Sequence, residues 1–209
     1  MLHSLMIAVA IGFTVIADAQ TGLTQYGFEA LLSNTAGNYN SAFGYQSLRS
    51  HRIGSNNTAV GYRSLYTDST GNNNTGIGFS ALYNNTGSGN TATGNVSLYR
   101  NTSGMFNTAN GNAALYGNLT GSNNTGIGNS ALTSNTTGSY NTAIGHLALA
   151  DNLNSSYNTA TGALSLYQNE TGSENTANGY SVLYSNFNST GNTGMGYRAL
   201  YTNTGNYNT

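Results

Sequence analysis

Glycine, leucine and asparagine recur along this chain at regular, short intervals. One glycine recurs eleven times in steps of 17, apart from a step of 16 between Gly78 and Gly94. A leucine follows each of these glycines by four residues, from Leu31 to Leu200, and an asparagine precedes ten of the eleven by four residues. The unit reads Asn-Thr-Ala-x-Gly-x-x-Ala-Leu-Tyr, followed by a segment of Asn, Thr, Ser and Gly.

The first part of this unit predicts a short β-strand. Over residues 57–61 successive side chains alternate between opposite faces, which places Ala59 and Gly61 on one side, close to another backbone. The Ala-Leu-Tyr stretch predicts a second strand, and Thr70-Gly71 marks a turn in which glycine tolerates a positive φ. The repeat is too short to hold a helix pair. The sequence therefore predicts an all-β fold, a β-solenoid (β-roll) of about eleven 17-residue coils.

Stacking of the coils would place equivalent side chains above one another. Neighbouring strands in a sheet lie about 4.8 Å apart, so eleven coils would form a rod about 50 Å long. Each leucine would extend an apolar column that no single unit can bury, and asparagines would exchange amide hydrogen bonds along the axis. Aromatic side chains would stack in files, such as the one from Tyr66 to Tyr116. The expected structural ladders consist of Gly61, Gly78, Gly94, Leu65, Leu82, Leu98, Leu115, Leu132, Leu149, Asn57, Asn74, Asn90, Asn107, Asn124 and Asn141.

The repeats occupy residues 23–209, and residues 1–22 form an apolar N-terminal segment. Its apolar run, from Leu5 to Ile16, is too short to cross a bilayer comfortably as a helix. The Ala-Asp-Ala sequence at 17–19 is typical of a signal-peptidase site. Alternatively, the segment is a retained assembly strand, because residues 10–13 match 59–62 as a degenerate repeat. Both interpretations predict export to the cell surface or the extracellular space.

Composition and charge exclude several classes of function. Charged residues make up 5% of the 209, the formal net charge is −1, and the chain contains no Lys, Pro, Cys or Trp. Without a basic patch, we expect no nucleic-acid partner. Without cysteine there are no disulfides and no thiolate metal sites.

Candidate catalytic chemistry is also missing from the sequence. The three histidines are His3, His51 and His146, and the six acidic residues are scattered without the spacing of a calcium loop or a catalytic pair. Glu170 and Glu174 flank one turn, where they are better interpreted as solvated charges than as cation ligands. We therefore predict no enzyme activity, no cofactor and no metal site.

The units Asn57-Thr58-Ala59-Val60-Gly61 and 141–145 resemble the head repeats of YadA-like trimeric autotransporter adhesins. They resemble still more closely the Asn-Thr-Ala-x-Gly-x-x-Ala-Leu tandem arrays of bacterial surface proteins and phage tail fibres. The resemblance covers nearly the whole chain from Gly27. It implies a left-handed β-roll, surface display, and an adhesive or structural role. The chain departs from the adhesins in having a longer unit, no heptad stalk and no C-terminal membrane β-barrel.

These features predict a subunit of an extracellular structural fibre that polymerises head to tail. The sequence stops at residues 206–209, partway through a unit, and its N-terminal segment offers the missing Ala-x-Gly. An N-terminal strand that completes the last coil of another copy would give an open filament. The residues expected at this subunit interface are Ala10, Ile11, Gly12, Phe13, Ile16, Tyr207, Asn208 and Thr209.

Three alternatives stay open. The chain could be an adhesin or phage-tail-like binding module, assembled as a discrete homotrimer. An ice-binding solenoid is a minor alternative, because one threonine file is present but its partner file has threonine only at Thr93 and Thr161. Covalent glycans are an open question as well, since Asn-x-Ser/Thr occurs eleven times, little more often than composition predicts.

Overall fold

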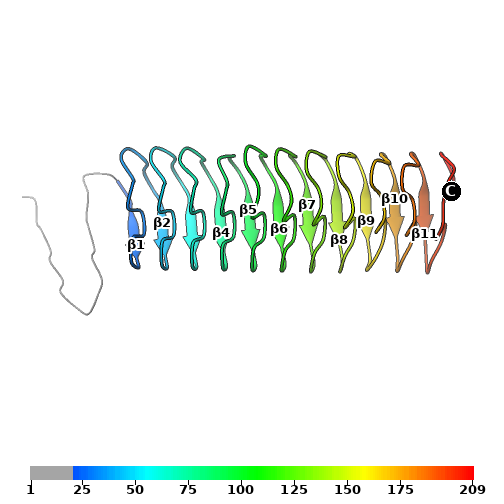
Figure 1. The fold of residues 1–209 in the computed structure, drawn as a ribbon, viewed down its shortest axis with the longest axis horizontal. Coiled ribbons are helices and arrows are strands. Elements are labelled where there is room, and N and C mark those ends of the chain that lie inside the picture. Colours follow the sequence, from blue (N-terminus) through cyan, green and yellow to red (C-terminus); the bar gives the residue numbers. More distant parts are fainter. Residues whose placement is uncertain (1–20) are drawn as a thin grey trace, which may run out of the picture.

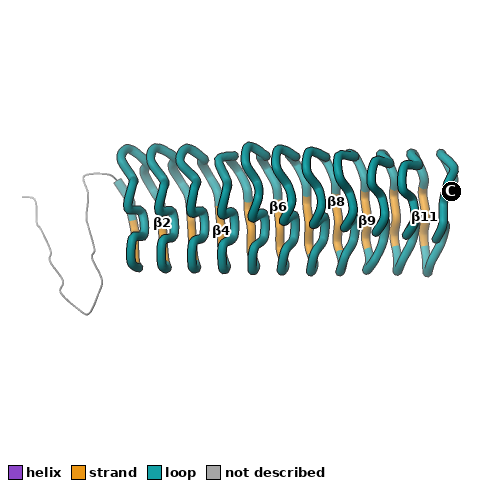
Figure 2. The backbone as a smooth tube through the Cα atoms, viewed as in Figure 1, coloured by secondary structure: helices purple, strands orange, loops and turns teal. Residues whose placement is uncertain are grey.

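The computed structural model describes residues 21–209, which form a straight stack of similar coils (Figure 1). Each coil contributes one three-residue strand, and the eleven strands form one parallel sheet in chain order. Turns and loops make up the rest of each coil, and no helix occurs in this part of the chain (Figure 2). The strands are β1 (Thr24–Tyr26), β2 (Ser41–Phe43), β3 (Thr58–Val60), β4 (Thr75–Ile77), β5 (Thr91–Thr93), β6 (Thr108–Asn110), β7 (Thr125–Ile127), β8 (Thr142–Ile144), β9 (Thr159–Thr161), β10 (Thr176–Asn178) and β11 (Thr193–Met195). The predicted β-solenoid is confirmed.

The strand register follows the sequence repeat. Thr58 pairs with Thr75, which lies 17 residues further along the chain. Thr75 pairs in the same way with Thr91, although the coil between them is one residue shorter. The shorter coil loses its residue in the turn, where the Asn85 side chain reaches the carbonyl oxygen of Gly87, two residues on. In the next coil the equivalent bond from Asn101 to Gly104 spans three residues. The turn therefore absorbs the deletion, and the sheet keeps its register.

The Ala-Leu-Tyr stretch is not a second strand, which corrects the prediction. It forms consecutive turns in which Arg63 (φ 52°) and Leu65 (φ 51°) are both left-handed, and every coil repeats this pattern. The Leu65 N–H donates to Ala81 of the following coil at 2.9 Å, whereas the Arg63 N–H donates to Tyr45 of the preceding coil at 2.9 Å. The chain thus bends without leaving these amides unpaired. A left-handed conformation costs about 1–2 kcal/mol per non-glycine residue.

The turn glycine also differs from expectation, since Gly71 does not have a left-handed φ. The left-handed residue in that turn is Asn73 (φ 57°), which directly precedes Asn74. Asparagine tolerates this conformation better than most residues. Gly71 is required for a different reason: a Cβ there would lie 2.5 Å from the carbonyl oxygen of Gly87 in the next coil.

The apolar core is a column of leucines flanked by alanines along the whole stack. Nine leucines, from Leu48 to Leu183, are fully buried, whereas Leu31 and Leu200 of the terminal coils are slightly or partly exposed. The strand alanines Ala42, Ala59, Ala92, Ala109, Ala143, Ala160 and Ala177 are also fully buried. Burying a leucine contributes about 1.5–3 kcal/mol relative to leaving it exposed, which offsets the cost of its left-handed backbone.

The glycine that ends each strand allows the coils to approach one another. Gly94 has a φ of +130°, and a Cβ on it would lie 2.5 Å from the carbonyl oxygen of Gly111 in the next coil. Gly196, in the last coil that contains a strand, has a comparable φ of +109° but no atom within 4 Å of the same position. A side chain at Gly94 would therefore meet both backbone strain and crowding between coils, whereas one at Gly196 would meet the strain alone.

We predict that Gly94→Ala lowers the free energy of unfolding by about 2–5 kcal/mol, because strain and collision add. The matched control Gly196→Ala should lose only the strain, about 1–3 kcal/mol. Denaturant unfolding followed by circular dichroism measures both. An equal loss in the two variants would show that crowding between coils does not explain the glycine.

Candidate functional site

The predicted asparagines lie in one buried file, here called the strand-side ladder, that runs through the interior next to the sheet. The side-chain oxygen of Asn57 accepts the backbone N–H of Asn74 at 2.9 Å, and its own N–H donates in the same way to Asn40 at 2.9 Å. The Asn57 side-chain amide donates to the carbonyl oxygen of Gly71 at 2.8 Å. The expected amide-to-amide bonds also occur, as from Asn57 to Asn40 at 3.1 Å, but the link that recurs in every coil ends on the backbone N–H.

A second buried file, here called the turn-side ladder, was not predicted from the sequence. It lies three residues after each leucine, where nine of the eleven units carry asparagine. The Asn118 side-chain amide donates to the Asn101 side-chain oxygen at 2.6 Å and to the Gly121 carbonyl oxygen at 2.9 Å. The signal that could have revealed this file is its constant spacing from leucine. Its members are Asn34, His51, Asp68, Asn85, Asn101, Asn118, Asn135, Asn152, Asn169, Asn186 and Asn203.

The two ladders are joined through the turn. The carbonyl oxygen of Gly121 accepts Nδ2 of Asn107 at 2.8 Å from the strand-side ladder and Nδ2 of Asn118 at 2.9 Å from the turn-side ladder. A buried amide without a partner costs about 1–3 kcal/mol. This shared acceptor therefore lets each coil bury two asparagine side chains without that penalty.

His51 and Asp68 replace asparagine in two consecutive rungs of the turn-side ladder, and both side chains are fully buried. The His51 ring nitrogens lie 2.9 Å from the Asp68 carbonyl oxygen and 2.7 Å from the Gly54 carbonyl oxygen. The Asn57 side-chain amide also lies 3.5 Å from Nε2 of His51, so the ring contacts both ladders. Asp68 accepts the Gly71 N–H at 2.7 Å and the Asn74 amide at 3.2 Å, as a carboxylate does.

The interior therefore contains two ionisable groups in adjacent coils. Burial raises the pKa of Asp68 above its ordinary value, and the charge of His51 and the bonds from Gly71, Asn85 and Asn74 partly oppose this shift. Every other turn-side rung is a neutral amide. This pair is the one chemical departure within the turn-side ladder, and the sequence analysis did not single it out.

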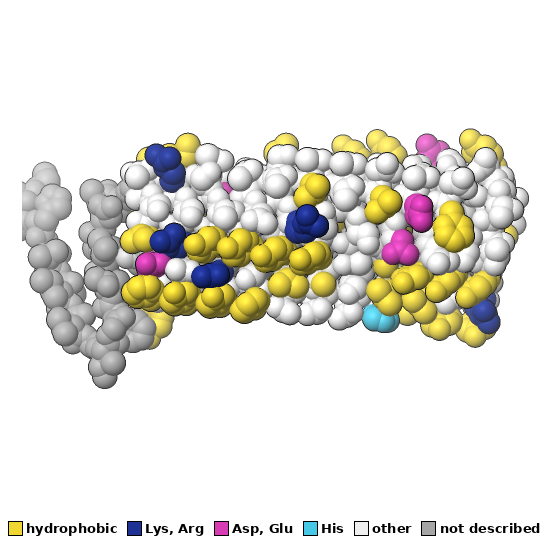
Figure 3. All heavy atoms as spheres, viewed as in Figure 1, with side chains coloured by type: hydrophobic (Ala, Val, Ile, Leu, Met, Phe, Trp, Pro, Cys, Tyr) yellow, Lys and Arg dark blue, Asp and Glu magenta, His cyan; other side chains and the backbone are white. Residues whose placement is uncertain are grey.

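The surface carries stacked aromatic files over the first coils. Phe28, Tyr45, Tyr62 and Phe79 stack with ring centroids 5.0–5.6 Å apart, and Tyr66, Tyr83, Tyr99 and Tyr116 stack at 4.9–5.4 Å. Figure 3 shows two hydrophobic bands along this part of the rod, with charged side chains between them.

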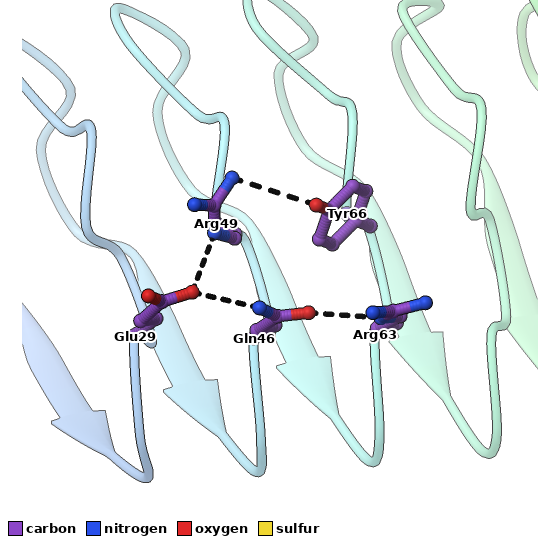
Figure 4. Close-up of polar contacts among 5 residues, drawn as sticks. All are labelled: Glu29, Gln46, Arg49, Arg63 and Tyr66. Carbon is purple, nitrogen blue, oxygen red and sulfur yellow. Dashed lines mark hydrogen bonds and ion pairs between the residues drawn. The ribbon is translucent and has the colours of Figure 1, made fainter.

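The charged side chains between these files form a connected chain (Figure 4). Glu29 accepts bonds from Gln46 and Arg49, both at 2.7 Å, and Gln46 in turn accepts one from Arg63 at 2.8 Å. The Arg63 guanidinium lies 5.0 Å from the centroid of the Tyr62 ring. The bonds to Arg49 and Gln46 hold the pKa of Glu29 below its ordinary value. The contacts link three successive coils on the outside of the rod.

The outer face of the sheet carries the threonine file considered for ice binding. Threonine occupies the first position of every strand except β2, where Ser41 replaces it. The third position varies from Val60 and Ile77 to Asn110 and Met195, which are all exposed. A second regular threonine file is therefore missing from this face, as the sequence indicated.

The predicted interface residues fall in two places. Ala10, Ile11, Gly12, Phe13 and Ile16 lie outside the described residues. Asn208 takes the next rung of the strand-side ladder: its N–H donates to the Asn192 side chain at 2.9 Å, and its carbonyl oxygen accepts the Thr193 N–H at 2.8 Å. Tyr207 is exposed. Thr209 lines a hollow of about 480 Å³ beside β11, together with Thr193, Gly194, Met195, Ala199 and Leu200.

Residues 21–209 contain no cluster of three or more acidic, histidine or cysteine side chains that could hold a metal ion. No helix in this range is long and apolar enough to cross a membrane. Of the Asn-x-Ser/Thr sites, those at Asn101, Asn118, Asn135 and Asn169 are fully buried in the turn-side ladder. The exposed sites are Asn56, Asn73, Asn95, Asn123, Asn154 and Asn188.

Comparison with known proteins gave no match to any family model, curated protein or solved structure. The coils and their ladders place the chain in the structural class of tandem-repeat β-solenoids.

We predict that His51→Asn and Asp68→Asn each lower the free energy of unfolding by about 3–5 kcal/mol, because each leaves one ionisable group buried among neutral amides without the other in the adjacent coil. The double variant restores a uniform amide ladder and should be at least as stable as the unaltered chain. Denaturant unfolding of all four proteins gives the coupling energy. Additive losses in the double variant would contradict the interpretation as a pair.

The pH dependence of stability provides a second test of this pair. A carboxyl group whose pKa is raised on folding contributes stability below its unfolded-state pKa and loses that contribution as pH rises through the folded-state value. Because burial raises the pKa of Asp68, the unaltered chain should lose stability relative to the double variant across that interval. Parallel stability curves for the two proteins would contradict this prediction.

Proposed function

We propose that this chain is a structural rod of an extracellular fibre, and that further copies extend it end to end. The observation that carries this proposal is the equivalence of the coils. Each coil offers the next one the same strand edge, the same leucine and the same amide acceptors. Such an interface accepts any coil with the same repeat, whether it comes from the same chain or from another copy.

The edge of β11 is suited to receive another coil. Inside the stack, the carbonyl oxygens of Val60 and Tyr62 accept N–H groups from the following coil, both at 2.8 Å. The equivalent residues of the last strand-bearing coil are Met195 and Tyr197, whose exposed fractions are 70% and 74%. The apolar hollow beside them exposes part of Leu200, the end of the leucine column. A strand added here would gain backbone hydrogen bonds and bury apolar surface.

The occupant we propose is the N-terminal segment of a second copy. Residues 10–13 repeat the Ala-x-Gly-aromatic pattern of 59–62, and Ile16 stands where the unit places Leu65. The segment therefore carries the residue types that fill the same positions inside the stack. Head-to-tail contacts of this kind are not self-complementary, so they generate open filaments rather than closed dimers. Export to the cell surface or the extracellular space is part of this proposal with the segment retained, and the exposed Asn-x-Ser/Thr sites leave room for glycans.

We predict that the purified 209-residue chain forms filaments of uniform width in negative-stain electron microscopy. Deleting residues 1–16 should abolish them, and so should Leu200→Asp, which introduces a charge into the end hollow. The matched control Leu153→Asp changes a leucine that is 42% exposed on the side of the rod, and it should still form filaments. Filaments that persist in both the deletion and Leu200→Asp would refute the end-to-end contact.

A second candidate function, an adhesin-like binding module, is favoured by the apolar surface of the first four coils. Phe28, Phe43, Ile77 and Phe79 have exposed fractions of 40–61%. Contiguous exposed apolar side chains often mark interaction sites. For this function we expect a discrete oligomer without filaments and saturable binding to a cell or glycan surface. Binding should weaken in the double variant Phe28→Ser/Phe79→Ser. It should persist in the control Phe187→Ser, which changes an exposed phenylalanine outside this surface. Equal binding by the two variants would exclude the apolar surface of the first four coils as the binding site.

A further inference from the structure

Tyrosines from successive coils lie face to face along the rod. Eight tyrosine pairs stack with ring centroids 4.9–5.6 Å apart. The longest run contains Tyr66, Tyr83, Tyr99 and Tyr116, whose neighbouring rings are inclined by 10–16°. All four are partly buried, so each keeps some contact with solvent. The coil register fixes which ring neighbours which.

We infer that this tyrosine file, from Tyr66 to Tyr116, is a site of oxidative cross-linking, at which a one-electron oxidant such as a peroxidase with hydrogen peroxide joins neighbouring tyrosines as dityrosine. The cross-link would tie one coil covalently to the next. The chain contains no cysteine, so disulfides cannot provide such a link. This inference goes beyond the proposed function, because the link forms within one chain whether or not copies associate.

The chemistry balances with hydrogen peroxide as the terminal oxidant. Each of two phenols loses one electron and one proton and becomes a phenoxyl radical with spin density on the ring carbons ortho to oxygen. Two such carbons form one carbon–carbon bond, and the hydrogen on each then returns to the phenolic oxygen, which restores both aromatic rings. The two electrons and two protons removed reduce one hydrogen peroxide to two waters. Each cross-link therefore lowers the mass of the chain by two hydrogen atoms.

The arrangement favours coupling within the file over coupling between molecules. A radical on Tyr99 has Tyr83 and Tyr116 at 5.0 and 5.4 Å, so its partner is already in place. Holding two reacting groups next to each other replaces a diffusional encounter with an intramolecular step. For two ortho carbons to bond, the rings need to move from this stacked arrangement toward an edge-on one.

The position of the arginines provides a direct readout. Trypsin cleaves after Arg63, Arg100 and Arg198, so Tyr99 belongs to peptide 64–100 and Tyr116 to peptide 101–198. The Tyr99–Tyr116 contact is the one tyrosine stack among the described residues that connects these two peptides. A cross-link there keeps the peptides joined after the denatured protein is digested.

The experiment oxidises the full chain with peroxidase and hydrogen peroxide at several dilutions, followed by digestion and mass spectrometry. We expect peptides 64–100 and 101–198 to be joined with a loss of two hydrogens, in a yield that does not depend on protein concentration. Tyr116→Phe keeps an aromatic ring but lacks the phenol, so the joined peptide should be lost. The matched control Tyr207→Phe changes a tyrosine outside the stacked pairs and should leave the yield unchanged.

Three results would overturn the inference: no joined peptide in the unaltered chain, an undiminished yield in Tyr116→Phe, or a yield that rises with protein concentration. The same measurement on Leu200→Asp separates this inference from the proposed fibre. A joined peptide in that variant supports cross-linking within the chain even if end-to-end assembly fails. Loss of the joined peptide in that variant would show that the link depends on assembly, and would also overturn the inference.

Discussion

The hydrogen bond from one asparagine side chain to the backbone of the next coil is the interaction on which this structure depends. It recurs at 2.9–3.0 Å from Asn40 to Asn208. Each coil buries only one leucine and a few small apolar residues, which is too little to fold alone. Polar side chains fill the other half of the interior, and they are stable there because identical neighbours satisfy them. The repeat in sequence is therefore a condition for burying these amides.

A steric constraint acts together with these bonds. The coils approach so closely at the strand-ending glycine that a Cβ on Gly44 would lie 2.6 Å from the carbonyl oxygen of Gly61. Asparagine can be replaced by another polar residue, as His51 and Asp68 show in the turn-side ladder. The glycine cannot, because both its positive φ and the neighbouring backbone exclude a side chain. This accounts for its presence in all eleven units.

The regular period of the sequence was sufficient to predict the solenoid, the leucine column and the inward asparagines. When coils stack, residues at the same position of the repeat lie above one another and share the same surroundings. It did not predict the local backbone. Leucine has no intrinsic preference for a left-handed conformation, so nothing in the Ala-Leu-Tyr stretch indicated turns; only hydrogen bonding to both neighbouring coils imposes them. The turn-side ladder was missed because its asparagines lie among other polar residues. His51 and Asp68 also interrupt the pattern, because they replace asparagine in two consecutive units.

Sequence variation is constrained differently in the interior and on the surface of the rod. Inside, a substitution must satisfy two neighbouring coils, so the rungs are nearly uniform from one end to the other. Outside, the position after the strand-ending glycine changes from Phe28 and Tyr45 to Asn95, Asn112 and later His146 without disturbing the sheet. The surface files can therefore vary while the ladders hold the coils together. Apart from His51 and Asp68, the differences between one stretch of this rod and another lie in those outer files, so we expect a contact with a partner or a chemical modification to occur there.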